Sequence, residues 1–312
     1  MILNTIYIII GIVLVLWGAD HLTEGASVLA RRMSVPEIII GLTIVAAGTS
    51  APELFVSMAS ALKDTPDMAL GNVVGSNIFN TLLIVGCSAM AAPMTIAKST
   101  VCKDIPFGIA ASLLLLVVVL TGNAISRMEG LVLLAGFAVF MVYTFRVAMS
   151  AGESTATLAA SVSTNVWKNC LYILGGLAAL IFGSDLFVDS ASAVARQLDI
   201  SEGVIGLTIV AGGTSLPELA TSVVAARKGQ SAMAIGNAIG SNVFNILLIL
   251  GVTASISPMQ IEGITKVDLT VMLLSILLVW GFSYSKYTIT RWEGSILMLT
   301  FLAYMGWLMY NL

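Results

Sequence analysis

The feature that most constrains this chain is an internal repeat. The segment GLTIVAAGTSAPEL at residues 41–54 returns as GLTIVAGGTSLPEL at residues 206–219, with 12 of 14 positions identical and an offset of 165 residues. The segment GNVVGSNIFN at residues 71–80 returns as GNAIGSNVFN at residues 236–245 with the same offset. The chain is therefore made of two copies of one unit.

Each copy is strongly apolar. Of the 312 residues, 58% are hydrophobic and only 10% are charged, whereas a soluble domain carries about 25% charged residues. A helix that spans a membrane needs about 20 mostly apolar residues, and backbone groups in lipid must be satisfied within the helix. The sequence thus predicts an all-α integral membrane protein with ten spans, at residues 3–29, 36–62, 67–93, 104–121, 128–149, 169–191, 202–226, 231–257, 267–284 and 292–311.

The spans divide into two halves of five. We expect a first repeat at residues 1–149, a linker rich in Ser, Thr and Ala at residues 150–166, and a second repeat at residues 167–312. An odd number of spans per repeat inserts the second copy in the opposite sense, an arrangement found in transporters that bind substrate near the midplane between the repeats.

The positive charges predict which side faces the cytoplasm. Connections on one side of the predicted membrane hold ten Lys and Arg residues and those on the other side hold four. Cytoplasmic connections carry the excess of Lys and Arg. We therefore expect a multi-pass protein of the plasma membrane with a cytoplasmic linker and both termini outside.

A carboxylate lies within the second predicted span. Glu53 follows Pro52, which cannot donate a hydrogen bond to the carbonyl of Gly48, so the helix should break near residues 46–50. Thr49 and Ser50 precede Glu53 by four and three residues, so the three side chains can share one helix face. The second repeat supplies the same set at Thr214, Ser215, Pro217 and Glu218.

The third span of each half adds further oxygen-bearing side chains. They recur every four residues, at Asn72, Ser76 and Asn80 and again at Asn237, Ser241 and Asn245. Two carboxylates with hydroxyl, amide and freed carbonyl oxygens are suited to a hard cation, and Ca²⁺ takes 6–8 oxygen ligands in irregular geometry. A single Ser or Asn in a membrane usually joins helices. A matched pair of intramembrane acids beside broken helices indicates function.

These motifs identify the family that the chain resembles. GTSAPE and GTSLPE, each followed by a GNxxGSN helix, resemble the calcium/cation antiporter superfamily, the sodium/calcium exchangers and their prokaryotic relatives. The resemblance covers essentially the whole chain. It implies ten helices, exchange of Ca²⁺ for Na⁺ by alternating access, and a first and a sixth helix that slide over a core of the other eight.

The resemblance also implies the ion ligands. They would be Glu53, Thr49, Ser50, Ser76, Asn80 and the carbonyl of Ala46 in the first half, with Glu218, Thr214, Ser215, Ser241, Asn245 and the carbonyl of Ala211 in the second. Calcium itself would be held by Glu53, Glu218, Thr49 and Thr214. Sodium-coupled members often carry Asp at the position of Asn245. Two carboxylates could also carry two protons, so an H⁺-coupled antiporter of Ca²⁺ or another cation stays open as the alternative.

Weaker signals complete the prediction. Asp20 and Glu24 in the first span, repeated by Asp185 and Asp189 in the sixth, are either acidic ion entrances or helix ends that reach interfacial water. The chain lacks HExxH, DDxxD and nucleophile-elbow motifs, which argues against a membrane enzyme. The repeat argues against a passive channel. We expect no cofactor, no nucleic acid and no obligate protein partner, only the transported ions and the bilayer.

Overall fold

A computed structural model describes residues 2–33, 35–62, 66–122, 124–155, 166–198, 211–260 and 264–310, and almost all of them are helical. In the first half the helices are α1 (Ile2–Arg32), α2 (Glu37–Ile40), α3 (Ala46–Thr49), α4 (Ala51–Leu62), α5 (Pro66–Ile78), α6 (Val85–Ala91), α7 (Ile105–Gly122) and α8 (Arg127–Thr155). Three π-helical segments join some of them end to end, namely η1 (Gly41–Val45), η2 (Phe79–Ile84) and η3 (Thr100–Asp104).

The second half repeats this pattern. Its helices are α9 (Val166–Gln197), α11 (Ala211–Thr214), α12 (Leu216–Arg227), α13 (Ser231–Val243), α14 (Leu250–Ile256), α15 (Lys266–Tyr284) and α16 (Arg291–Tyr310), with the π-helical segment η5 (Phe244–Ile249). The segments η2 and η5 lie at equivalent places of the repeat, since Asn80 and Asn245 each occupy their second residue. Single turns of π-helix inside α-helices are frequent at functional sites.

The helices follow the predicted spans closely. Within the described residues, seven helices are long and apolar enough to cross a membrane, and the pair Glu37–Thr49 and Ala51–Leu62, bent by 46°, makes an eighth span if counted as one. α16 covers most of the tenth predicted span, residues 292–311. Residues 202–210 of the seventh predicted span lie outside the described residues, and α11 and α12 form the rest of it.

Two helices extend into the predicted linker. The linker was expected to begin at residue 150, but α8 continues to Thr155, and α9 already begins at Val166, the last residue assigned to the linker. Residues 150–155 read SAGEST and contain no proline, so each backbone N–H can still take part in a helix there. The central part of the predicted linker, residues 156–165, lies outside the described residues.

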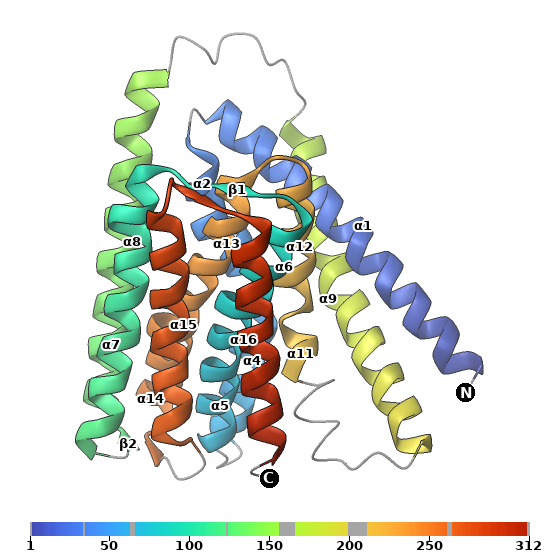
Figure 1. The fold of residues 1–312 in the computed structure, drawn as a ribbon, viewed down its shortest axis with the longest axis vertical. Helices are drawn as coiled ribbons and strands as arrows, with labels where there is room; N and C mark the ends of the chain where they lie inside the picture. The colour runs from blue at the N-terminus through green and yellow to red at the C-terminus, as the bar shows by residue number, and fades with distance from the viewer. Residues whose placement is uncertain are drawn as a thin grey trace.

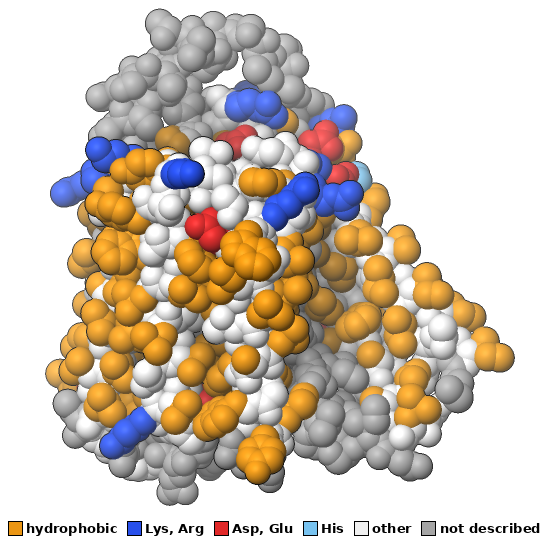
Figure 2. All heavy atoms as spheres, in the orientation of Figure 1, with side chains coloured by type: hydrophobic (Ala, Val, Ile, Leu, Met, Phe, Trp, Pro, Cys, Tyr) orange, Lys and Arg blue, Asp and Glu red, His pale blue; other side chains and the backbone are white. Residues whose placement is uncertain are grey.

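Two short sheets show in which direction equivalent helices of the two halves run. β1 (Met94–Thr95) pairs with β4 (Thr288–Ile289), and β2 (Ala124–Ile125) pairs with β3 (Met259–Gln260), both antiparallel. The two sheets lie at opposite ends of the bundle (Figure 1). Because α7 leads from β1 to β2 whereas α15 leads from β3 to β4, these equivalent helices of the two halves run in opposite directions. Most Lys and Arg side chains visible in Figure 2 gather at the end that carries β1 and β4.

The core lies around the third span of each half. In the most apolar stretch of Met68–Ala91, 72% of residues are buried, and in that of Ser231–Ile256 the share is 78%. The corresponding share in α1 is only 22%. α1 and α9 pack mainly against each other and lie to one side of the bundle (Figure 1). The most protected environment is therefore the one around α5, η2, α13 and η5.

Candidate functional site

The predicted break of the second span is present. α3 ends at Thr49, α4 begins at Ala51, and Ser50 between them has φ −83° and ψ 6°, outside the helical range. Pro52 lies in the first turn of α4, where its missing N–H costs nothing. Glu53 therefore begins a new helix in the middle of the span, and its side chain is only 1% exposed.

The second repeat breaks in the same way. α11 ends at Thr214, α12 begins at Leu216, and Ser215 has φ −91° and ψ 4°. Pro217 is again in the first turn of the new helix, and Glu218 follows it with an exposure of 1%. Two buried carboxylates thus lie at the starts of two helices, where unpaired backbone N–H groups favour negative charge.

Reciprocal hydrogen bonds bring the two breaks together. Ser50 Oγ donates to Glu218 Oε1 at 3.0 Å, and Ser215 Oγ donates to Glu53 Oε1 at 3.4 Å. Each serine of one repeat therefore contacts the glutamate of the other. Ser215 Oγ also lies 3.4 Å from Ser76 Oγ of α5. These contacts bring Ser50, Glu53, Ser76, Ser215 and Glu218 together across the repeat interface.

Two asparagines hold the broken helices in place. Asn72 Nδ2 donates to the carbonyl oxygen of Glu53 at 3.2 Å and to Ser57 Oγ at 3.0 Å. Asn237 Nδ2 makes the equivalent bonds to the carbonyl of Glu218 at 3.3 Å and to Ser222 Oγ at 2.9 Å. These amides fix each glutamate backbone to the neighbouring helix. In addition, Thr49 Oγ1 lies 3.2 Å from Asn237 Oδ1 and ties α3 to α13.

Several buried oxygens in this region have no donor to satisfy them. In the part of the chain that the structure describes, the buried side-chain oxygens without a hydrogen-bond partner include Glu53 Oε2, Glu218 Oε2, Ser241 Oγ, Asn80 Oδ1 and Asn245 Oδ1. Leaving a buried polar atom unpaired costs about 1–3 kcal/mol, and more for a charged group. Oxygen atoms of this kind are the ligands that Na⁺ and Ca²⁺ take. This set of oxygen ligands therefore fits a cation.

The remaining predicted ligands lie on the same elements. Ala46 begins α3, and its carbonyl accepts the backbone N–H of Ser50 at 2.9 Å. Ala211 begins α11, and Thr214 ends it. Ser76 and Ser241 lie on α5 and α13, while Asn80 and Asn245 lie in η2 and η5. Among the described residues, no group of three or more acidic, Cys or His side chains could hold a metal ion, so an ion here would depend on neutral oxygens as well as the two glutamates.

Sequence reasoning missed two buried amides. Asn77 and Asn242 belong to the GSN part of each repeated motif and are 1% and 3% exposed. Asn80 Nδ2 donates to Asn242 Oδ1 at 3.0 Å, while Asn77 Oδ1 has no partner among the described residues. Their recurrence at the same offset of 165 residues was the signal that could have singled them out.

The four acidic residues predicted at ion entrances differ in their contacts. Asp20 is ion-paired with Lys228 of α12, with 2.7 Å between Oδ1 and Nζ. Glu24, Asp185 and Asp189 are exposed and have no ion-pair partner in the described part of the chain. The structure thus brings none of these four into the buried cluster of Glu53 and Glu218.

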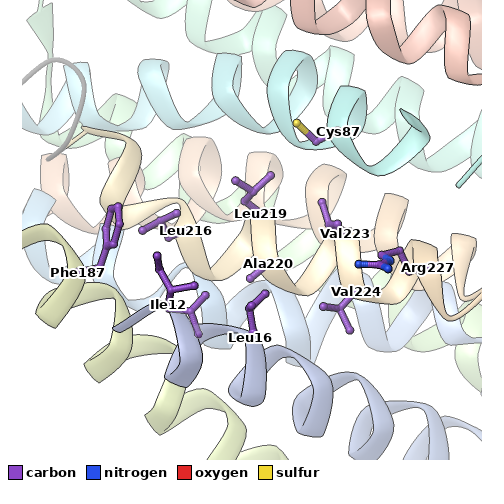
Figure 3. A pocket seen from close by; sticks show the side chains of 11 residues that line it. Ile12, Leu16, Cys87, Phe187, Leu216, Leu219, Ala220, Val223, Val224 and Arg227 are labelled. Carbon is purple, nitrogen blue, oxygen red and sulfur yellow. The ribbon is translucent and has the colours of Figure 1, made fainter. Parts of the chain in front are cut away.

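Glycines allow α1 and α9 to approach closely. A Cβ atom added at Gly18 would lie 2.6 Å from the carbonyl oxygen of Gly176, and one added at Gly11 would lie 2.7 Å from that of Gly183. Real Cβ atoms essentially never approach within 3.0 Å, so only glycine fits at these crossings. The contact between α1 and the rest of the bundle is looser. A groove of about 360 Å³ runs between α1 and α12, lined by apolar side chains such as Leu16 and Leu219 (Figure 3).

A helical membrane protein in which two broken helices place buried carboxylates in its centre is typical of ion transporters. Comparison with known proteins agrees. The model of the sodium/calcium exchanger protein family matches residues 3–146 and 168–310. The chain belongs to this family, within the calcium/cation antiporter superfamily.

Three similar proteins match over almost their full length. The chain is 39% identical over 313 residues to the putative antiporter CaxA of Alkalimonas amylolytica, covering 97% of this chain and 98% of the relative. It is 32% identical over 346 residues to the sodium/calcium exchanger MaX1 of Methanosarcina acetivorans, covering 98% and 99%. A structure of the sodium-calcium exchanger NCX_Mj superposes with a TM-score of 0.86 at 31% identity, covering 98% of this chain and 99% of that one.

Proposed function

We propose that this protein is a secondary antiporter that exchanges Ca²⁺ for Na⁺ across the membrane. The observation that carries the proposal is the reciprocal cluster at the two helix breaks. Glu53 and Glu218 are buried, each is bonded by a serine of the other repeat, and each keeps one oxygen without a partner. The names of MaX1 and NCX_Mj as sodium/calcium exchangers support the same pair of ions.

Charge explains how one site can serve both ions. Two carboxylates balance one Ca²⁺, which offsets the cost of burying them. Three Na⁺ ions in the same cluster would leave one positive charge. Calcium would be held by Glu53, Glu218, Thr49 and Thr214. Sodium would use the flanking oxygens, those of Ser50, Ser76, Asn80, Ser215, Ser241, Asn245 and the carbonyls of Ala46 and Ala211.

The transport cycle would follow from an inverted repeat of ten spans, residues 1–149 and 167–312. The opposite directions of α7 and α15 support the inversion. The pair α1–α9 is tightly packed within itself by glycine contacts and borders the bundle across an apolar groove. We infer that this pair moves as one body over the remaining helices and exposes the cluster to the two sides in turn.

The charge distribution sets the proposed orientation. The end of the bundle that carries β1 and β4 also carries most of the visible Lys and Arg side chains (Figure 2). By the positive-inside rule this end would face the cytoplasm, with both termini outside and the linker inside. The membrane would be the plasma membrane, and the glutamate and aspartate positions Glu24, Asp185 and Asp189 would lie where ions enter from the aqueous phases.

One observation supports H⁺ as an alternative counter-ion to Na⁺. Asn80 and Asn245 are both neutral, so the two glutamates are the acidic groups of the cluster, and each could release a proton when Ca²⁺ binds. Radiolabelled Ca²⁺ uptake into proteoliposomes separates the two cases. Uptake driven by internal Na⁺ without a pH gradient supports sodium coupling. Uptake driven only by a pH gradient in the absence of Na⁺ establishes proton coupling, and uptake without any counter-ion establishes a channel.

A further inference from the structure

Lys228 makes an unusual set of contacts with α1. It caps the C-terminus of α12, and its Nζ lies 2.7 Å from Asp20 Oδ1, 2.7 Å from the carbonyl oxygen of Asp20 and 2.9 Å from Thr23 Oγ1. An ammonium group has three donors, and all three reach oxygens of one turn of α1. Thr23 is fully buried and donates in turn to the Asp20 carbonyl at 3.0 Å.

This contact joins the two bodies that the proposed cycle separates. α12 begins beside Glu218 and ends at Arg227, so Lys228 lies at the far end of the helix that carries a site glutamate. Between these ends, α12 faces α1 across the apolar groove, with Arg227 at one end of it (Figure 3). Apolar contacts across a groove are not directional, so they hold the position of one helix along the other less strictly than hydrogen bonds do. The Lys228 contacts do, because a shift of one helical turn, about 5.4 Å, would carry Asp20 and Thr23 out of hydrogen-bond range.

A second polar contact lies at the same end of α1. Ser27 Oγ donates to Glu37 Oε1 of α2 at 2.6 Å. The equivalent positions on α9 are engaged differently in the described part of the chain. Asp185, equivalent to Asp20, is exposed without an ion-pair partner, and the buried hydroxyl of Ser192, equivalent to Ser27, has no hydrogen-bond partner. Lys63, the repeat equivalent of Lys228, lies outside the described residues, and α9 has its own polar contact with α11, from Ser184 Oγ to the carbonyl oxygen of Gly213.

We propose that Lys228 is a latch that holds α1 on α12 in one of the two access states and must release it during each exchange cycle. The inference rests on the proposed function, since it assigns Lys228 a positioning role in that transport. Lys228 does not touch the ion cluster. Its contribution is to favour one position of α1, so its loss changes the balance between access states and leaves the ion ligands intact.

Crosslinking tests the latch directly. Cysteines replace Asp20 and Lys228 in a chain whose native Cys87, Cys102 and Cys170 are changed to serine. A short bifunctional methanethiosulfonate reagent joins the two cysteines, because side chains as long as lysine separate backbones further than a disulfide can span. We expect crosslinking to lower Ca²⁺ exchange by about tenfold or more, with recovery on reduction, while equilibrium Ca²⁺ binding stays within about twofold.

Each outcome has a distinct meaning. Full exchange by a crosslinked protein would overturn the latch, because the contact would then persist through the cycle. The two single-cysteine variants treated with the same reagent control for its direct effect. If the wild-type protein exchanges no Ca²⁺ in any gradient, the proposed function fails, and with it the latch that rests on it.

A double-mutant cycle provides a second test. Lys228→Gln and Asp20→Asn each remove the ion pair, so their effects on exchange should not add. The exchange rate of the double variant should differ by about threefold or more from the rate that the two single effects predict together. Arg227→Gln is the matched control, since Arg227 is adjacent, carries the same charge and makes no ion pair among the described residues. It should leave exchange within about twofold. Additive effects of Lys228→Gln and Asp20→Asn would contradict the latch.

Discussion

The contact between α1 and α9 gives a prediction that depends only on geometry. A methyl group added at Gly176 would lie 2.8 Å from both the carbonyl oxygen of Gly18 and the backbone nitrogen of Leu22. The same methyl added at Gly175 would have nothing within 4 Å. Gly176→Ala and Gly175→Ala are therefore a matched pair that differ in one respect, the presence of a neighbouring backbone.

The size of the effect follows from these distances. Ordinary van der Waals contact begins at 3.4 Å, so α1 and α9 must separate by 0.6 Å, the difference between 3.4 and 2.8 Å, to accept the methyl group of Gly176→Ala. Backbone atoms cannot rotate away as a side chain can. Overpacking of this kind costs about 1–3 kcal/mol. Both variants gain the same helix propensity, at most about 1 kcal/mol, so this term cancels in the comparison.

We expect Gly176→Ala to unfold at a lower temperature in detergent than Gly175→Ala, and to exchange Ca²⁺ more slowly because the α1–α9 pair no longer packs as one body. Thermal unfolding followed by tryptophan fluorescence and proteoliposome exchange measure the two effects. Equal unfolding midpoints for the two variants would refute the reasoning, since they would mean that α1 and α9 are not in backbone contact.

Three further predictions concern the cluster. Glu53→Gln and Glu218→Gln should each lower Ca²⁺ exchange by about 100-fold or more with a normal gel-filtration profile, because a neutral amide no longer balances the divalent charge; near-normal exchange in either would contradict the site. Asn245→Asp should keep Ca²⁺ binding and alter the pH dependence of exchange, since it adds a titratable group; an unchanged pH profile would place Asn245 outside the site. Asn237→Ala removes the bonds to the Glu218 carbonyl and Ser222 and should lower thermal stability by about 1–3 kcal/mol, whereas a wild-type midpoint would show that these bonds do not hold α12.

Local features were predicted well because they have local causes. A proline in a membrane helix leaves the carbonyl four residues earlier without its donor, so the break expected at residues 46–50 is found between Thr49 and Ala51. The end of α8 was predicted less well. Its continuation to Thr155 has no sequence signal, since a polar composition alone does not end a helix.

The sequence placed polar side chains on one face of the third span, but it did not show which of their atoms make contacts. Their spacing of four residues grouped Asn72, Ser76 and Asn80 as side chains whose oxygens could bind a cation. In the structure the amide nitrogen of Asn72 donates to the Glu53 carbonyl, whereas that of Asn80 donates to Asn242 and leaves the Asn80 amide oxygen without a partner. Spacing places a side chain on a face, but the neighbouring helices decide which groups its atoms meet.

By itself, the sequence determined that the chain is a helical membrane protein of two equivalent halves, with a carboxylate at a helix break in each. These properties follow from hydropathy, from proline geometry and from the repeat. Only the tertiary structure decided which groups meet. Ser50 contacts Glu218 across 168 residues of chain, and Lys228 contacts Asp20 across 208 residues. Contacts at such separations depend on how the helices pack, because a membrane helix has an apolar surface on which many neighbours fit equally well, and close packing and polar contacts select the partner.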